Sequence, residues 1–324
     1  MKIILSRAGF GILLGLIVSL SVAAQVAASG EPEFSGMSYL DNGKIRVGVN
    51  LDIGGAITYL SKSGSDENIV NSADWGRQIQ MSFYSGPNPF EPNGKKPKEV
   101  WRFLGWNPIQ AGDTYGNKSR VTKHMNDGET LFVECIPMHW PLDNQPAQAR
   151  FQLKLELEGN LVRAEATILN NRSDTTDYGE RDQEIPAVYT NGTFWRLFTY
   201  DGDAPFTGAP MRQITKVWDT GKTPQEMEGG PWDSWVGTEK WAALVNDDGF
   251  GLGVYAPTAD RFSGGYAGEP GAGGPKDEPT GYISPIKRVR LLHDTVYTYE
   301  YTLIVGQLKE IREKVYAIAI LGSE

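Results

Sequence analysis

Apolar and polar residues alternate along much of the chain, which is the pattern of β-strands with one buried face. One such run covers residues 151–157, the dipeptide Gly159-Asn160 marks a turn, and a second run covers residues 161–168. Two alternating runs joined by a short turn predict a β-hairpin.

Other segments show the same preference for strands. Residues 296–305 place tyrosines at every second position, which predicts a long strand with one aromatic face, and residues 250–255 follow a turn at 246–249 as a hairpin arm. Helical spacing appears only near the end of the sequence, where apolar residues from Leu308 to Tyr316 predict a short helix.

Two stretches lack regular patterns, namely Ser85–Lys98 and Ser263–Gly281, and the chain as a whole has 38 glycines and 19 prolines. Long loops in a compact domain often carry function, although insertions without a role are the alternative. Together the patterns predict an all-β fold: a large antiparallel β-sandwich with long loops and a short C-terminal helix.

The first residues have the pattern of a secretory signal peptide. Lys2 and Arg7 precede an apolar stretch from Phe10 to Val22, and small residues follow. We therefore expect a signal peptide at 1–28, a single β-sandwich domain at 31–324, and a secreted or periplasmic protein. A membrane anchor is the alternative, but the apolar stretch is short for a bilayer span.

Charge and composition exclude several classes of function. The 31 Lys and Arg residues against 40 Asp and Glu residues give a net charge of −9, which argues against nucleic-acid binding. One cysteine, Cys135, allows neither an intramolecular disulfide nor a thiolate metal cluster, and the three histidines lack metal-binding spacing. We expect no cofactor, no metal and no membrane contact after signal removal; the sequence leaves the oligomeric state open.

Nine tryptophans stand near Gly, Asn, Asp and Arg residues, a composition that fits a saccharide site. Indole faces stack on sugar rings, and amide, carboxylate and guanidinium groups pair with sugar hydroxyls. Packing in the core is the alternative for these aromatic residues. The candidate residues for substrate binding are Arg77, Gln80, Trp106, Asn107, Tyr189, Trp232 and Trp235.

Carboxylates crowd the segment 180–184, and like charges held close together raise at least one pKa, as a general acid requires. A solvated loop with an ion pair to Arg181 is the alternative. For two-carboxylate chemistry we place Glu184 or Asp182 in one role and Asp113, Glu239 or Glu269 in the other. His139 is the best placed of the histidines and is a further catalytic candidate.

The order of these features resembles the galactose mutarotase-like (supersandwich) superfamily of carbohydrate-active proteins. Residues 53–58 (Ile-Gly-Gly-Ala-Ile-Thr) look like the opening strand of an aldose epimerase, and residues 71–80, with Gly76-Arg77, look like its segment with a sugar-binding arginine. Residues 162–171 followed by Ser173-Asp174 resemble the strand and turn before the family's catalytic histidine, and residues 297–305 resemble its closing strand.

The sequence departs from that family at its catalytic groups. Where an epimerase has a histidine acid, this chain has Gln183-Glu184-Ile185-Pro186, and Glu269 or Glu278 matches the family's glutamate base only loosely. This argues against plain mutarotation, and the superfamily fold also carries polysaccharide lyases and glycosidase domains.

The leading hypothesis is an exported glycoside hydrolase that cleaves a largely neutral poly- or oligosaccharide with a pair of carboxylates. One alternative is a polysaccharide lyase, in which His139 or Tyr189 is the base and Arg77 neutralises a uronate. The others are an aldose-epimerase-like enzyme and a non-catalytic glycan-binding protein.

Overall fold

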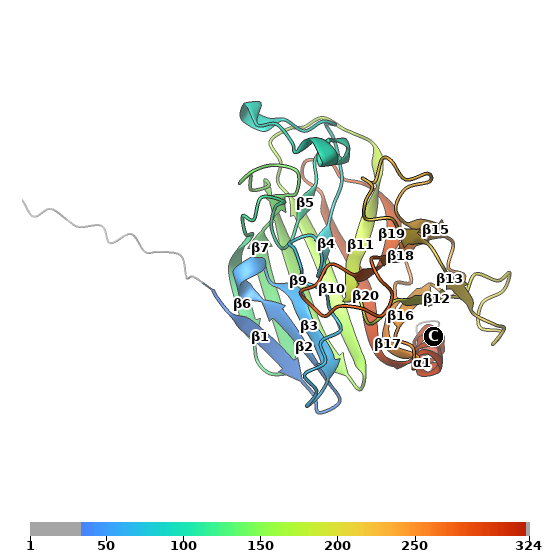
Figure 1. Cartoon of the computed structure of the whole chain (residues 1–324). Helices are drawn as coiled ribbons and strands as arrows, with labels where there is room; N and C mark the ends of the chain where they lie inside the picture. The colour runs from blue at the N-terminus through green and yellow to red at the C-terminus, as the bar shows by residue number, and fades with distance from the viewer. Residues whose placement is uncertain (1–33, 322–324) are drawn as a thin grey trace, which may run out of the picture. The chain divides into compact units, whose positions relative to one another are not determined.

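The computed structural model describes residues 34–321, and within this range the strands form two sheets, one of eleven strands and one of nine (Figure 1). The predicted signal peptide at 1–28 lies outside the described residues. The eleven-stranded sheet contains β1 (Met37–Asp41), β2 (Ile45–Asn50), β3 (Ala56–Lys62), β4 (Ile79–Ser82), β5 (Pro108–Ile109), β8 (Met138–His139), β11 (Glu180–Asn191), β14 (Val217–Trp218), β15 (Asp233–Trp235), β18 (Arg261–Ala267) and β19 (Thr280–Arg290).

The nine-stranded sheet and the helices complete the fold. This sheet contains β6 (Arg120–Asn126), β7 (Thr130–Ile136), β9 (Ala149–Glu158), β10 (Leu161–Asn170), β12 (Arg196–Thr199), β13 (Arg212–Ile214), β16 (Trp241–Val245), β17 (Phe250–Tyr255) and β20 (Val296–Gln307). Three short 3-10 helices, η1 (Leu51–Ile53), η2 (Pro92–Gly94) and η3 (Glu99–Leu104), and one α-helix, α1 (Leu308–Leu321), are the helical segments of the described residues.

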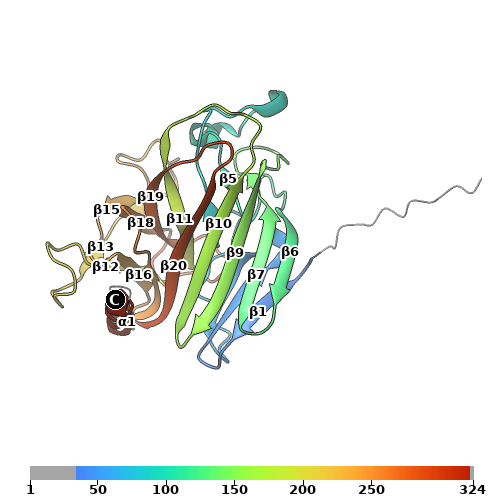
Figure 2. The same ribbon diagram turned by 180° about the vertical axis from the view of Figure 1, so that it is seen from behind.

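Pairing is antiparallel except where β14 joins β18. Eight strands of the eleven-stranded sheet follow the order β1-β2-β3-β4-β11-β19-β18-β14, while β15 pairs with β18, and β5 pairs with β4 and β8. The nine-stranded sheet has the order β13-β12-β16-β17-β20-β10-β9-β7-β6 (Figure 2). β9 and β10 form the predicted hairpin, with Val162 opposite Leu157 and Ile168 opposite Phe151. The expected all-β antiparallel sandwich with a short C-terminal helix is therefore confirmed.

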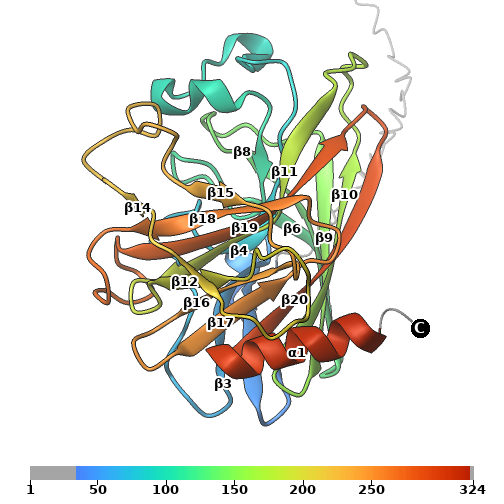
Figure 3. The same ribbon diagram turned by 90° about the vertical axis from the view of Figure 1, so that its right-hand side faces the viewer.

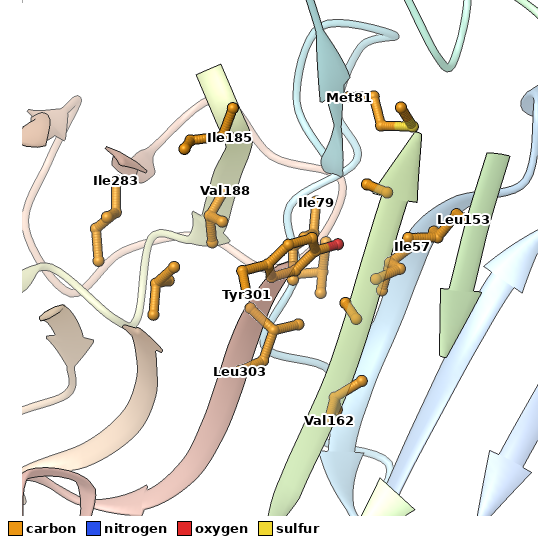
Figure 4. Close-up of a cluster of buried hydrophobic side chains, with 14 of the residues drawn as sticks. Ile57, Ile79, Met81, Leu153, Val162, Ile185, Val188, Ile283, Tyr301 and Leu303 are labelled. Atoms are coloured by element: carbon orange, nitrogen blue, oxygen red, sulfur yellow. The ribbon is translucent and has the colours of Figure 1, made fainter. Parts of the chain in front are cut away.

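The core lies between the two sheets and takes alternate side chains from each (Figure 4). Ile57, Ile185 and Ile283 come from the eleven-stranded sheet, while Val162 and Leu303 come from the other. Because side chains of a strand alternate between its faces, their sequence neighbours on β11 and β19 point away from the core. Those neighbours form the floor of the cleft described below.

The predicted C-terminal helix is confirmed as α1, which packs on β16, β17 and β20 (Figure 3). Ile311 and Val315 are fully buried against these strands. A Cβ at Gly253 of β17 would lie 2.3 Å from Ile311 Cγ2, so the close approach of helix and sheet requires glycine there. No helix among residues 34–321 is both long enough and apolar enough to cross a membrane.

A β-bulge in β11 decides which side chains face outward. The pairing of β11 with β19 shifts between Glu184 and Val188, a stretch that includes Pro186. Proline has no amide hydrogen for the ladder and is tolerated at such a bulge. The shift places Ala187 and Tyr189 on the same outer face as Glu184, whereas uninterrupted alternation would have turned them toward the core.

The two segments expected to be irregular differ in outcome. The stretch 85–98 contains only the short η2, as predicted. In the stretch 263–281 the prediction is wrong at both ends, because β18 continues to Ala267 and β19 begins at Thr280. Glycines within β18 explain this error, because glycine weakens the pattern of a strand and is also common in turns.

Candidate active-site cleft

A cleft of about 690 Å³ lies on the outer face of the eleven-stranded sheet, over β4, β11, β18 and β19. This volume falls in the range typical of small-molecule sites. Its floor is formed by side chains that alternate with core residues on these strands. These are Ser82, Tyr84, Glu184, Ala187, Tyr189, Ala267, Thr280 and Tyr282.

Aromatic side chains form two walls of the cleft, each held together by its own ring contacts. Trp101 and Phe103 of η3 stand with Trp140 on one wall, and Trp218 and Trp232 stand on the other. Four of the nine tryptophans therefore line this one cleft. The walls meet where Gln225 Nε2 donates a hydrogen bond of 3.3 Å to the Val100 carbonyl oxygen.

Trp232 lies directly against the floor because the sheet beneath it carries glycine. A Cβ at Gly265 would stand 3.2 Å from the Trp232 ring and 2.8 Å from the Lys216 carbonyl oxygen. The indole packs on the Tyr282 ring at 4.8 Å between centroids, and Tyr282 packs on Tyr189 at 4.7 Å. This gives a continuous aromatic surface from wall to floor.

Glu184 lies on the floor, where both of its oxygens accept hydrogen bonds from tyrosines. Tyr84 Oη donates to Glu184 Oε2 at 2.7 Å, and Tyr282 Oη donates to Oε1. Ser82 Oγ in turn donates to Tyr84 Oη at 3.1 Å. Among the described residues no cation pairs with Glu184, so its orientation is set by hydroxyl groups alone.

The tyrosines around Glu184 remain protonated donors. Burial, followed by the negative charge of Glu184, raises the pKa of Tyr84 and of Tyr282 well above its ordinary value. The same two causes raise the pKa of Tyr189. No protein group within the described residues hydrogen-bonds the Tyr189 hydroxyl, so it is available to a bound molecule.

Arg77 lies at the edge of the cleft and is already paired. Its guanidinium contacts Asp74 Oδ2 at 3.2 Å and Glu278 Oε2 at 2.8 Å, and it donates to the Glu278 carbonyl oxygen at 2.6 Å. The ionisable side chains of the lining, tyrosines aside, are this arginine and the three carboxylates Asp74, Glu184 and Glu278. The cleft therefore carries net negative charge.

Five of the residues predicted from the sequence line this cleft, namely Glu184, Arg77, Asn107, Tyr189 and Trp232. Asn107 is buried and donates to the Phe83 carbonyl oxygen at 2.9 Å and to Ser82 Oγ at 3.4 Å. Its amide thus supports the end of β4, which carries Ser82, and the residues up to Tyr84 that follow it.

Asp182 lies two residues before Glu184 on β11, but it does not line the main cleft. A hydrogen bond from Arg261, which reaches its Oδ2 at 2.7 Å, lowers the pKa of Asp182. Crowding therefore does not raise the pKa of Asp182, because Arg261 and Arg288 pair with it. The alternative is corrected too: the segment is strand β11, and the partners of Asp182 are Arg261 and Arg288, not Arg181.

The other three predicted carboxylates lie elsewhere. Asp113 is buried in a turn, where it accepts hydrogen bonds from the amides of Tyr115, Asn117 and Asn144. Glu239 is buried in an ion pair with Arg312 of α1. Glu269 is exposed in the loop after β18. None of the three lines the cleft.

The remaining predicted residues are buried structural groups. His139 is packed between Phe90 and Trp106, and burial lowers its pKa to about 3, so it stays neutral at ordinary pH. Gln80 Oε1 accepts the amide of Ala111. Trp106 and Trp235 belong to the core between the sheets, so neither contacts a molecule in the cleft.

Sequence reasoning missed several lining residues. Trp101, Trp140 and Tyr84 belong to aromatic segments that stood out, but nothing in their spacing separates them from core aromatics. Tyr282 alternates with buried Ile283, a strand signal that was hidden by the surrounding glycines and prolines. Among the described residues no group of three or more His, Cys, Asp or Glu side chains is arranged to hold a metal ion.

No protein-family model and no curated protein matches the sequence. Among solved structures the chain is similar to a galactose mutarotase-related enzyme from Lactobacillus acidophilus (12% identity, TM-score 0.48, 83% of this chain and 97% of that one). It is also similar to a galactose mutarotase-like protein from Lactobacillus casei (10%, 0.47, 83% and 100%). A third is the GH36 α-galactosidase AgaA from Geobacillus stearothermophilus (10%, 0.46, 84% and 40%).

The first two of these structures are named as galactose mutarotase-related or galactose mutarotase-like, which is the class that the sequence resemblance gave. At such low identities and TM-scores the likeness says nothing about activity. The function is therefore argued from the residues of the cleft.

Proposed function

We propose that this protein is a carbohydrate-active enzyme that binds a neutral saccharide in the cleft and acts on its anomeric carbon, with Glu184 as the reacting carboxylate. The observation that carries the proposal is the setting of Glu184: a carboxylate without a cation, oriented by two tyrosine hydroxyls, on the floor of a cleft with tryptophan walls. A carboxylate on a floor of this kind fits the role of a base or nucleophile.

The walls support a saccharide as the ligand. Trp101 and Trp140 in one wall and Trp218 and Trp232 in the other offer flat apolar faces to the C–H surface of a sugar ring. The free Tyr189 hydroxyl supplies a polar contact between them. Apolar walls with a few polar groups are typical of sites that orient a small polar ligand.

The charge of the cleft favours a neutral substrate over a uronate. A lyase must neutralise the uronate carboxylate, and Arg77 is the only cation in the lining of the cleft as described. Two carboxylates, Asp74 and Glu278, already pair with it. A polyanion would therefore meet net repulsion, which argues against the lyase alternative.

The first candidate reaction is hydrolysis of a glycosidic bond. Glu184 would act as base or nucleophile, and Glu278 or Asp74, which also line the cleft, would protonate the leaving oxygen. Water supplies the hydroxyl added to the anomeric carbon and the hydrogen that remains on the leaving group. Carboxyl groups separated by about 5–5.5 Å give retention, and about 6.5–9.5 Å gives inversion.

The second candidate is an epimerase-like reaction at the anomeric carbon of a free sugar. It is favoured by one observation: Glu184 is the single carboxylate of the lining without a cation, and Asp74 and Glu278 are both engaged with Arg77. A mechanism with one carboxylate and a tyrosine hydroxyl would use the groups that stand free. A glycan-binding protein without activity would need only the walls.

One experiment separates these functions. The purified protein is incubated with neutral disaccharides and oligosaccharides, with uronate polymers and with freshly dissolved single anomers, and anomeric signals are followed by ¹H NMR. We expect new reducing ends from neutral oligosaccharides. Faster anomer exchange alone indicates epimerisation, unsaturated products indicate a lyase, and binding without reaction indicates a lectin.

The matched controls are two variants of the same strand. Glu184→Gln is expected to abolish the reaction and to keep the fold, whereas Glu180→Gln, at the exposed start of β11, is expected to react like the unaltered protein. If Glu184→Gln keeps full activity, Glu184 has no part in the mechanism. If no saccharide binds or reacts, the proposed function is wrong.

A further inference from the structure

A second hollow of about 300 Å³ lies beside the main cleft, and three residues border both. These shared residues are Glu184 and its two hydrogen-bonding tyrosines, Tyr84 and Tyr282. The side pocket, as we name this hollow, is otherwise lined by Asp182, Ser234, Arg261, Ser263 and Ile286. Glu184 therefore stands at the boundary between two hollows and not at the end of one.

The two hollows follow each other along the same face of the same strands. Ser263 and Ala267 lie on the same face of β18. Ser263 borders the side pocket, and Ala267 borders the main cleft. On β19, Tyr282 borders both hollows and Ile286 only the side pocket. Both hollows therefore lie on the same face of the sheet. Glu184 lies opposite Ile286 in the pairing of β11 with β19.

The chemistry of the side pocket differs from that of the main cleft. Arg261 reaches Asp182 at 2.7 and 3.3 Å and Ser234 Oγ at 3.1 Å, which fixes a guanidinium and a carboxylate side by side. Both Arg261 and Asp182 keep more than a third of their side-chain surface exposed. Within the described residues, Ser263 Oγ has no hydrogen-bond partner. Neighbouring donors and acceptors of this kind match adjacent sugar hydroxyls.

We infer that the substrate is a saccharide of at least two units that lies across Glu184, with one sugar in the main cleft and the next in the side pocket. This inference rests on the proposed function, because it takes the anomeric carbon as the reacting centre. The bond between the two sugars then lies over Glu184, where a reacting carboxylate has to be. A monosaccharide fills only one hollow and leaves the polar groups of the other to water.

The test measures how affinity depends on chain length. The Glu184→Gln variant, which holds substrate without turnover, is titrated by calorimetry with a mono-, di- and trisaccharide of each neutral sugar that the unaltered protein binds. We expect the disaccharide to bind at least about tenfold more tightly than the monosaccharide, because charged groups of the side pocket add hydrogen bonds. A third unit adds less.

Two substitutions assign that gain to the side pocket. Arg261→Gln, added to Glu184→Gln, is expected to remove most of the gain for the disaccharide and to leave the affinity for the monosaccharide unchanged. Arg288→Gln is the matched control, because Arg288 also contacts Asp182, at 3.8 Å, but does not border either hollow. Circular dichroism and thermal unfolding confirm that each variant is folded, and Ser263→Ala serves as a milder second variant.

The outcomes separate this inference from the proposed function. Equal affinity for mono- and disaccharides, or a gain that survives both Arg261→Gln and Ser263→Ala, overturns the two-unit substrate while the reaction at Glu184 stands. Absence of any saccharide binding or turnover in the unaltered protein overturns both. A gain that Arg261→Gln removes and Arg288→Gln leaves intact supports the inference.

Discussion

Two carboxylates of this protein, Glu184 and Glu239, each lie beside tyrosine hydroxyls, yet their surroundings are opposite. Glu239 has no exposed surface and accepts five hydrogen bonds, from Arg312 twice and from the Phe206 amide, Tyr316 and Trp241. Glu184 accepts hydrogen bonds from two tyrosines, has no cation and borders two hollows. A carboxylate whose lone pairs are filled by its own protein anchors structure, whereas one left partly open is available for chemistry.

The largest effect that tests this comparison is the loss of activity in Glu184→Gln. An amide keeps the size of the side chain but cannot act as base or nucleophile, so we expect turnover to fall by at least about 100-fold. The measurement is the rate of product formation by ¹H NMR at matched concentrations of folded protein. A rate within twofold of the unaltered protein would show that turnover does not need the Glu184 carboxylate.

Glu239→Gln is expected to affect stability instead. It leaves the Arg312 guanidinium buried without its counter-charge, which costs about 3–5 kcal/mol in the free energy of unfolding. Urea denaturation measures this loss. Turnover per folded molecule should remain that of the unaltered protein, and a selective loss of turnover would show that Glu239 is more than an anchor.

The pH dependence of stability follows from the same ion pair. Burial alone would raise the pKa of Glu239, but hydrogen bonds from Arg312, Tyr316 and Trp241 lower it below the ordinary value. Its stabilising contribution is therefore complete above the unfolded-state pKa of about 4.3 and is lost as the pH falls through the folded-state pKa. We expect the stability difference between the unaltered protein and Glu239→Gln to be large at neutral pH and to shrink below about pH 4. A difference that is constant across this range would contradict the assignment.

A smaller effect is expected from the tyrosines that orient Glu184. Tyr84→Phe or Tyr282→Phe removes one hydroxyl donor and keeps the ring, so turnover should fall about tenfold. Tyr299→Phe is the matched control, because the Tyr299 hydroxyl is buried in the core and has no hydrogen-bond partner among residues 34–321. Equal rates for the Tyr282 and Tyr299 variants would show that the hydroxyls on Glu184 do not matter.

The smallest effect concerns the aromatic wall. Trp232→Leu removes the flat surface that packs on Tyr282, and we expect saccharide affinity to fall about two- to tenfold. Trp195→Leu serves as the control, since Trp195 bonds Asp247 outside the cleft. Calorimetric titration measures the saccharide affinity of both variants. If the aromatic wall contributes to binding, the Trp232 variant must bind more weakly than the Trp195 variant.

The sequence predicts much of the fold because the fold depends on local periodicity. The hairpin of β9 and β10 and the helix α1 each show in the spacing of their own apolar residues. The boundaries of β18 could not be predicted, because Gly264 and Gly265 weaken the strand pattern. Gly265 is needed there, since Trp232 packs directly against it.

The site is predicted less completely because it depends on which face each side chain takes. Trp106 and Trp232 are alike in sequence surroundings, but one belongs to the core and the other to the wall of the cleft. Glu184 and Tyr189 share a face only because of the bulge at Pro186, and strand periodicity alone puts them on opposite faces. Ion pairs made across the fold, such as Arg261 with Asp182, do not show in local spacing.

The central claim is that a saccharide lies across Glu184 between the aromatic walls. The most direct measurement is a crystal structure of the Glu184→Gln variant with a neutral oligosaccharide that the unaltered protein processes. We predict that the bond between two sugar units lies within hydrogen-bonding reach of residue 184, with one ring against Trp232. A saccharide bound elsewhere, with no contact to residue 184 or to the walls, would contradict the account.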